Sequence, residues 1–205
     1  MPSVSDSAGA GPDALVGRIG LTAADLSGGA TVRTLEGGDS FAGLITLDLC
    51  GAAFPSETHR IARHQVDVVP PGGRYTDTSG ISNEVVAYDS AAHAAAALTE
   101  WRAAAAACPL GAWRHMRVSD LPELRYDALS ERPDPHLPAA DNSRTTYTVT
   151  AHDSGDRGYG LLILQRHGTV LDAIYLTSES PLTPAITATA NHLADITGKR
   201  LIALT

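Results

Sequence analysis

The feature that most constrains the fold of this chain is its pair of cysteines, Cys50 and Cys108, the only two in the sequence. Cys108 ends an alanine-rich stretch, 90–108, whose apolar residues recur at spacings of three and four, as on one face of a helix. Ser90 can cap this helix and Pro109 follows it directly. We therefore expect Cys108 to lie on the last turn of the helix and to face the core.

Cys50 follows the apolar run 44–49 and precedes Gly51, which predicts the end of a buried strand. A disulfide between Cys50 and Cys108 would restrict the unfolded chain and stabilise the fold by about 4 kcal/mol. No metal-binding or redox spacing such as CxxC competes with this pairing. The alternative is two unpaired, buried cysteines in a cytosolic protein. The pair thus predicts a disulfide and an extracytoplasmic domain, with a cytoplasmic location as the alternative.

The composition indicates one domain that does not bind nucleic acid. A length of 205 residues suits a single core, and a formal net charge of −8 disfavours contact with phosphate backbones or anionic lipid. Residues 1–14 are rich in Ser, Gly and Ala, which predicts a flexible tether ahead of one domain over 15–205. No signal peptide or membrane-spanning run is visible. We expect any membrane attachment to come from a removed anchor ahead of Met1; a cytoplasmic protein with a disordered start is the alternative.

The apolar periodicities predict an α+β domain, an antiparallel β-sheet with two main α-helices packed on it and one disulfide. Strands are predicted over 31–35, 59–69, 84–88, 145–151, 159–167, 169–176 and 201–204, helices over 90–108 and 184–197, and a short helical or irregular segment over 15–26. Tight connections at 153–158 and Gly168 imply hairpins, and Gly198 is expected to stop the last helix. The apolar run 161–164 predicts a central strand covered on both faces. Residues 110–142, with four prolines, are expected to be irregular.

Several segments together resemble one known family. They are LDLC (47–50), EVVAYDS (84–90), AAHAAAALTEWRAAAAACP (91–109) and LLILQRHGTVLDAIYL (161–176). Their arrangement resembles the actinobacterial extracytoplasmic sensor domains of the PknH type, which occur on receptor kinases and as free lipoproteins. The resemblance extends over about 21–201, although many segments match only in pattern. It implies a domain with a broad cleft that binds extracellular ligands. This chain departs in having one disulfide at most and no kinase domain.

The candidate ligand-binding residues are polar side chains on the predicted strands. His64 and Asp172 each interrupt an apolar face, and an inward polar group must be hydrogen-bonded or line a cavity. Arg166 could pair with Asp172 across the hairpin, as a structural ion pair or as a ligand clamp. The full candidate set is Arg63, His64, Tyr88, Gln165, Arg166, Asp172 and Tyr175.

Neither a metal site nor a cofactor is expected. His59 and His64 are five residues apart on one strand, which sends them to opposite faces. His93 and His192 are expected to be solvated. The sequence has no nucleophile elbow and no glycine-rich phosphate loop.

Taken together, these features favour a non-enzymatic extracytoplasmic sensor module. It would bind a small or lipid-like molecule in a cleft between one sheet face and the segment 110–142. One alternative is a small enzyme of the cyclase or isomerase type, with His64 or Asp172 as general acid or base. Another is a protein–protein interaction module that binds its partner through 110–142.

Overall fold

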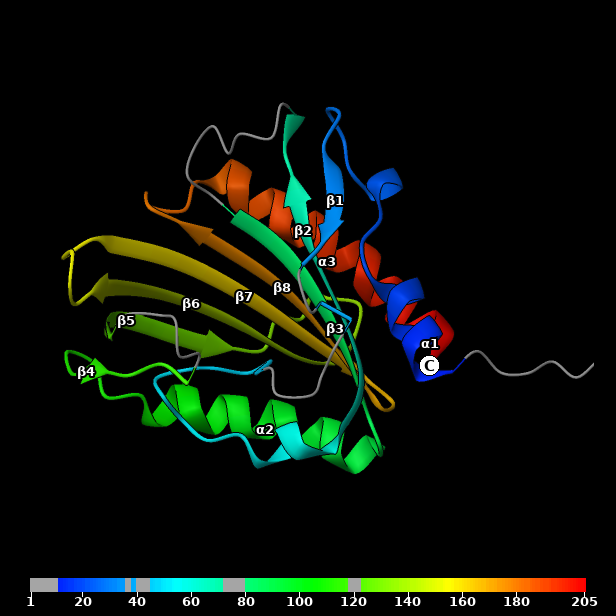
Figure 1. Ribbon diagram of the computed structural model, residues 1–205, viewed down its shortest axis with the longest axis horizontal. Coiled ribbons are helices and arrows are strands. Elements are labelled where there is room, and N and C mark those ends of the chain that lie inside the picture. Colours follow the sequence, from blue (N-terminus) through cyan, green and yellow to red (C-terminus); the bar gives the residue numbers. More distant parts are fainter. Residues whose placement is uncertain (1–10, 36–37, 40–44, 72–79, 118–122) are drawn as a thin grey trace, which may run out of the picture.

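An eight-stranded antiparallel sheet, with helices on both faces, forms the framework of the protein (Figure 1). The computed structural model describes residues 11–35, 38–39, 45–71, 80–117 and 123–205. The strands are β1 (Thr31–Thr34), β2 (Arg60–Val69), β3 (Gly80–Tyr88), β4 (Trp113–Arg114), β5 (Leu124–Arg132), β6 (Asp141–Ala151), β7 (Arg157–His167) and β8 (Val170–Ser178). Their order across the sheet is β1-β2-β3-β8-β7-β6-β5-β4. The helices are α1 (Pro12–Ile19), α2 (Ala91–Ala107) and α3 (Pro184–Leu204), with short 3-10 turns η1 (Ala23–Asp25) and η2 (Pro55–His59). The predicted α+β class is confirmed.

The two long helices cover opposite faces of the sheet, and α1 lies on the α3 side (Figure 1). Strand β7 shows why both are needed. Leu162 and Leu164 pack in the cluster around α2, whereas Leu161 and Ile163 pack in the cluster around α3. Each such buried side chain contributes about 1.5–3 kcal/mol. The prediction of a central strand covered on both faces is confirmed.

The disulfide Cys50–Cys108 ties the C-terminal end of α2 to the segment 45–50. The two Cα atoms are 5.6 Å apart and the residues are 58 positions apart in sequence. Ser90 caps the other end of α2 by accepting a hydrogen bond from the backbone N–H of His93. The predicted strand over 44–49 is wrong for 45–49, which is irregular, and residue 44 lies outside the described residues. Leu47 and Leu49 are buried there without pairing to a strand.

The segment 110–142, expected to be irregular, instead contains β4, β5 and the start of β6. A β-bulge between Tyr126 and Ala128 shifts the alternation of side chains along β5, so the two-residue period is broken in the sequence. The exposed positions of this strand are Ala128, Ser130 and Arg132. The prolines at 133, 135 and 138 lie in the connection from β5 to β6.

The last helix does not stop at Gly198 but continues to Leu204, so the predicted strand over 201–204 is wrong. Glycine is needed at 198 for close approach, because an added Cβ would lie 2.4 Å from Oε1 of Gln165 on β7. At the other end of the chain, α1 begins at Pro12, so residues 12–14 are not part of a tether. The rest of the predicted tether, 1–10, lies outside the described residues. Over the described part of the chain, no helix combines the length and apolarity that crossing a membrane requires.

Candidate functional site

A cleft of about 480 Å³ opens on the face of the sheet that α2 covers, between the segment 45–49 and strands β5 to β8. This volume lies within the range of sites that enclose small organic molecules. Most of its wall is apolar or aromatic, and the main contributors are Ile45, Leu49, Tyr126, Tyr147, Val149 and Leu162.

Aromatic side chains shape the cleft and are held in place by their surroundings. Trp101 of α2 is 3% exposed, and its Nε1–H donates to Oγ1 of Thr145 at 2.8 Å. The rings of Tyr126 and Tyr147 lie 5.8 Å apart between centroids. The ring of Tyr147 lies over Gly160, where an added Cβ would approach it to 2.0 Å. Glycine at 160 therefore leaves the space that the ring of Tyr147 occupies in the wall of the cleft.

The inner end of the cleft is polar and centres on Tyr175. Its hydroxyl lies 2.9 Å from Oε2 of Glu84 and 3.1 Å from the carbonyl oxygen of Thr46, both of which can accept its proton. Glu84 is 2% exposed and also accepts hydrogen bonds from Nε of Arg63 and from Oγ1 of Thr46. Burial and the Glu84 carboxylate raise the pKa of Tyr175 well above its ordinary value. The Tyr175 hydroxyl thus stays protonated and leaves its oxygen lone pair to accept from a ligand.

A second buried ion pair supports the first. Nη2 of Arg60 lies 3.4 Å from Oε2 of Glu57, and both side chains are less than a tenth exposed. Nη1 of Arg60 donates to Oγ1 of Thr46 at 2.7 Å, and the Thr46 backbone N–H donates to Oε2 of Glu57 at 2.9 Å. Burial raises the pKa of Glu57 above its ordinary value. Thr46 therefore joins the two ion pairs and fixes the segment 45–49 against the sheet.

The charged residues of the cleft are acidic. Of the described residues that line it, Asp48 and Glu179 carry a formal charge and none is basic. The backbone N–H of Arg117 donates to Oδ2 of Asp48 at 2.7 Å. An anionic ligand would therefore meet two carboxylates and no lining cation, which disfavours its binding.

The structure does not bring the seven predicted site residues together. Tyr175 lines the cleft, and Arg63 lies behind it through Glu84. Tyr88 is 1% exposed in the core beneath α2 and does not line the cleft. His64 lies on the opposite face of the sheet, where Nδ1 contacts Oδ1 of Asp39 at 2.6 Å.

The expected pair of Arg166 and Asp172 does not form. The register of β7 and β8 places Asp172 opposite Gln165, and Arg166 binds Oδ2 of Asp141 through Nε at 2.6 Å. Gln165 and Asp172 are both buried beneath α3, away from the cleft. Burial raises the pKa of Asp172 to about 6, although hydrogen bonds from Thr197, Asn83 and Gln165 act in the opposite direction.

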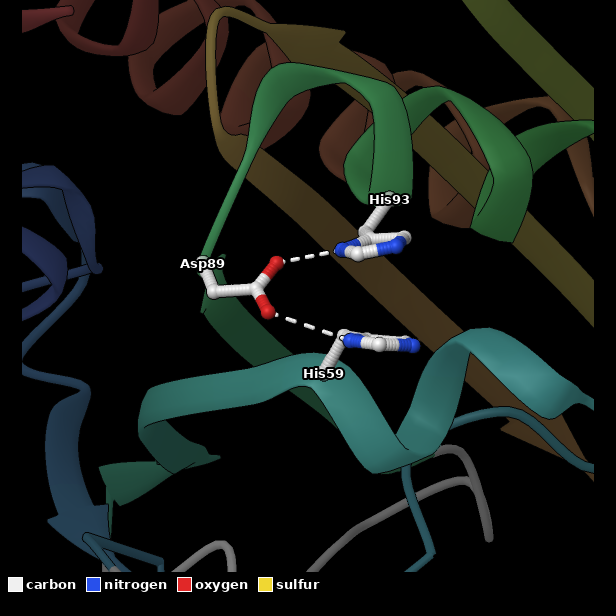
Figure 2. A group of neighbouring side chains, drawn as sticks. All are labelled: His59, Asp89 and His93. Carbon is white, nitrogen blue, oxygen red and sulfur yellow. Dashed lines mark hydrogen bonds and ion pairs between the residues drawn. The ribbon is translucent and has the colours of Figure 1, made fainter.

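A group outside the cleft was not predicted from the sequence. His59, Asp89 and His93 meet where η2, the end of β3 and the start of α2 come together (Figure 2). The pairing of Arg60 with Tyr88 brings His59 beside Asp89, and this register is visible only in the fold. The i,i+4 spacing of Asp89 and His93 at a helix start was the one local signal.

Comparison with known proteins points to a solved structure and to no sequence family. No protein-family model matches the sequence, and no curated protein matches it. The chain is similar to the extracellular domain of PknH from Mycobacterium tuberculosis, with 15% sequence identity and a TM-score of 0.48. The superposition covers 82% of this chain and 78% of that chain. Since this likeness is too low to transfer a function, we infer function from the cleft itself.

Proposed function

We propose that this protein is an extracytoplasmic domain that binds a small, uncharged, largely apolar molecule in the cleft beside α2. The observation that carries the proposal is the Tyr175 hydroxyl, held by buried Glu84 at the inner end of a mostly apolar cavity of about 480 Å³. Apolar walls supply affinity, and one positioned polar group orients the ligand. A ligand hydroxyl or N–H would suit this end of the cleft, because it can donate to the Tyr175 oxygen, whose own proton goes to Glu84 or Thr46.

The disulfide Cys50–Cys108 supports the proposed extracytoplasmic location. Structural disulfides persist in oxidising compartments and are rare in the cytosol. The disulfide would also support ligand binding, because it holds the end of α2 next to Leu49, a residue of the cleft wall. Intact mass of the natively expressed protein, with and without reductant, tests the location: one bridged pair supports it, and two alkylated thiols contradict it.

The enzyme alternative has no observation in its favour. Neither His64 nor Asp172, the two residues considered as general acid or base, lines the cleft. An acid or base must lie within hydrogen-bond reach of a bound reacting group. Binding of a protein partner through the segment 110–142 stays a prediction.

Two fluorescent probes test the proposed ligand class. N-phenyl-1-naphthylamine is neutral, and 8-anilinonaphthalene-1-sulfonate has the same aromatic skeleton with an added negative charge. We expect the neutral probe to bind with the higher affinity, because Asp48 and Glu179 repel the sulfonate. In a Trp113→Phe background Trp101 is the one remaining tryptophan, so energy transfer from it reports occupation of the cleft.

A matched pair of variants locates the bound probe. Val149→Phe fills the cleft and is expected to weaken binding of the neutral probe strongly. Thr146→Phe adds a similar ring to an exposed position on the opposite face of β6 and is expected to leave binding unchanged. Equal binding by both variants, or no energy transfer from Trp101, would overturn the proposal. Stronger binding of the sulfonate would contradict the preference for uncharged ligands.

A further inference from the structure

Three side chains with metal-binding chemistry converge at the start of α2, away from the cleft. His59 is the last residue of η2, Asp89 follows β3, and His93 lies in the first turn of α2. One ligand atom from each lies within 4.8 Å of the other two. Nδ1 of His59 is 3.1 Å from Oδ2 of Asp89, and Nδ1 of His93 contacts Oδ1 of the same carboxylate (Figure 2).

We propose that His59, Asp89 and His93 form a binding site for a divalent transition-metal ion of the zinc, copper or nickel type. Around a tetrahedral ion with bonds of about 2.0–2.1 Å, neighbouring ligand atoms lie roughly 3.3 Å apart. The 3.1 Å separation of Nδ1 of His59 from Oδ2 of Asp89 matches that spacing, and the two imidazole rings stack with their centroids 3.4 Å apart. The rings are nearly parallel, at 16°, so a common ion requires each ring to rotate about its Cβ–Cγ bond until both Nδ1 lone pairs point toward the ion.

The kinds of ligand select the kind of metal. Two imidazoles and one carboxylate suit zinc, copper and nickel, whereas magnesium and calcium need a shell of oxygen atoms. In the structure both rings turn Nδ1 toward the carboxylate. A metal ion takes the place of the N–H protons there, and each neutral ring then carries its proton on Nε2.

Backbone contacts hold the three residues in position. The backbone N–H of Asp89 donates to the carbonyl of His59 at 2.9 Å, and that of Tyr88 donates to the carbonyl of Thr169 at 2.9 Å. Ser90 caps α2 through the N–H of His93 at 3.2 Å. Metal binding therefore requires movement of side chains and little movement of the backbone, which limits its conformational cost.

Charge and access also suit a cation. The positive end of the α2 dipole disfavours a cation near the start of the helix. The carboxylate of Asp89 lies beside the same helix end, and its negative charge offsets that effect. The side chains of His59, Asp89 and His93 are 40%, 43% and 36% exposed, which leaves a path for the ion and room for water as a further ligand.

A bound ion would connect η2 to the N-terminal end of α2, while the disulfide ties the C-terminal end of the same helix. Because α2 contributes Trp101 to the cleft, the metal would fix the helix that covers the candidate ligand. The site itself is independent of the proposed function, since none of its three residues lines the cleft.

Isothermal titration of the full chain, stripped with EDTA, tests the proposal with zinc sulfate and, separately, magnesium chloride. We expect one zinc ion per chain and no magnesium binding. The affinity for zinc should fall about tenfold or more in His59→Ala, His93→Ala and Asp89→Asn, since even the outer partners of metal ligands contribute about tenfold. His192→Ala, an exposed histidine on α3, is the control and should bind zinc as the unaltered chain does. Circular dichroism checks that each variant is folded.

Electron paramagnetic resonance of the copper-loaded protein provides a second readout. Hyperfine structure from two imidazole nitrogens is expected in the unaltered chain and in His192→Ala, and from one in His59→Ala or His93→Ala. Full binding by the His59 and His93 variants would overturn the proposal, as would an equal loss in the control.

Discussion

The hydroxyl of Tyr175 on β8 contacts the buried carboxylate of Glu84 on the neighbouring strand β3, with 2.9 Å between Oη and Oε2. This contact joins the inner end of the cleft to a buried ion pair, because Oε1 of the same carboxylate accepts from Arg63. The surface that would meet a ligand and the charges that hold β2 to β3 are therefore parts of one network.

Removal of that hydroxyl should affect stability. In Tyr175→Phe the Glu84 carboxylate loses one of its donors, and a hydrogen bond to a charged group contributes about 1.5–3 kcal/mol. We expect the free energy of unfolding in urea to fall by that amount. Tyr159→Phe is the control, because Tyr159 also lines the cleft and its side chain has no hydrogen bond to the described residues. A loss of equal size in both variants would contradict the network.

Arg63 should be far more costly to remove than an exposed arginine. Arg63→Met leaves Glu84 charged, 2% exposed and without its cation, and an uncompensated buried charge costs about 3–5 kcal/mol. The double variant Arg63→Met with Glu84→Gln should recover part of the loss. Arg33→Met breaks an ion pair whose arginine side chain is 68% exposed, and should change the free energy of unfolding by less than about 1 kcal/mol. Chemical denaturation of the three variants measures these differences.

Asp172 should make stability depend on pH. Burial raises its pKa from the ordinary 3.8 to about 6, so between these values the native state holds a proton that the unfolded state has released. Its contribution to stability is therefore full below about pH 4 and is lost as the pH rises to 6. At about 1.4 kcal/mol per pKa unit the loss is roughly 3 kcal/mol.

Asp172→Asn isolates this effect, because all other titrating groups cancel in the comparison. The amide can accept from Asn83, whose Nδ2 lies 2.7 Å from Oδ1, and donate to Oγ1 of Thr197, which lies 2.6 Å from Oδ2. We expect the variant to gain stability relative to the unaltered protein by roughly 3 kcal/mol between pH 4 and pH 7. Urea denaturation at a series of pH values measures the difference, and a constant difference would count against a raised pKa.

Gly198 and Gly17 should respond oppositely to alanine, although both lie within helices. Alanine favours a helix over glycine by about 1 kcal/mol, and nothing lies within 4 Å of an added Cβ at Gly17, so Gly17→Ala should stabilise. At Gly198 the Cβ would meet the buried side chain of Gln165, whose Nε2 donates to the carbonyl of Ala194 at 2.7 Å. Displacing that amide costs about 1–3 kcal/mol, so Gly198→Ala should destabilise by about 1 kcal/mol net. Thermal unfolding of both variants tests the opposite signs.

Local pattern was sufficient for much of the fold. Helix α2 could be predicted from the cap at Ser90 and the three- and four-residue spacing that ends at Cys108, because helix periodicity and capping depend on neighbours in sequence. The central position of β7 followed in the same way from the run 161–164, which is apolar on both faces. The disulfide could be predicted because the chain contains only two cysteines.

The candidate sites, in contrast, depended on register and close approach, which no local pattern encodes. The bulge in β5 breaks the two-residue alternation by which a strand is recognised in the sequence. Gly198 lies inside α3 and not after it, because its close approach to Gln165 requires a glycine. The pairing of β7 with β8 put Asp172 opposite Gln165 and left Arg166 to another partner. By itself the sequence determined helix α2, the hairpin of β7 and β8 and the apolar character of both faces of β7. Only the tertiary structure decided which polar side chains meet, because a shift of one residue between strands sends every side chain to the other face.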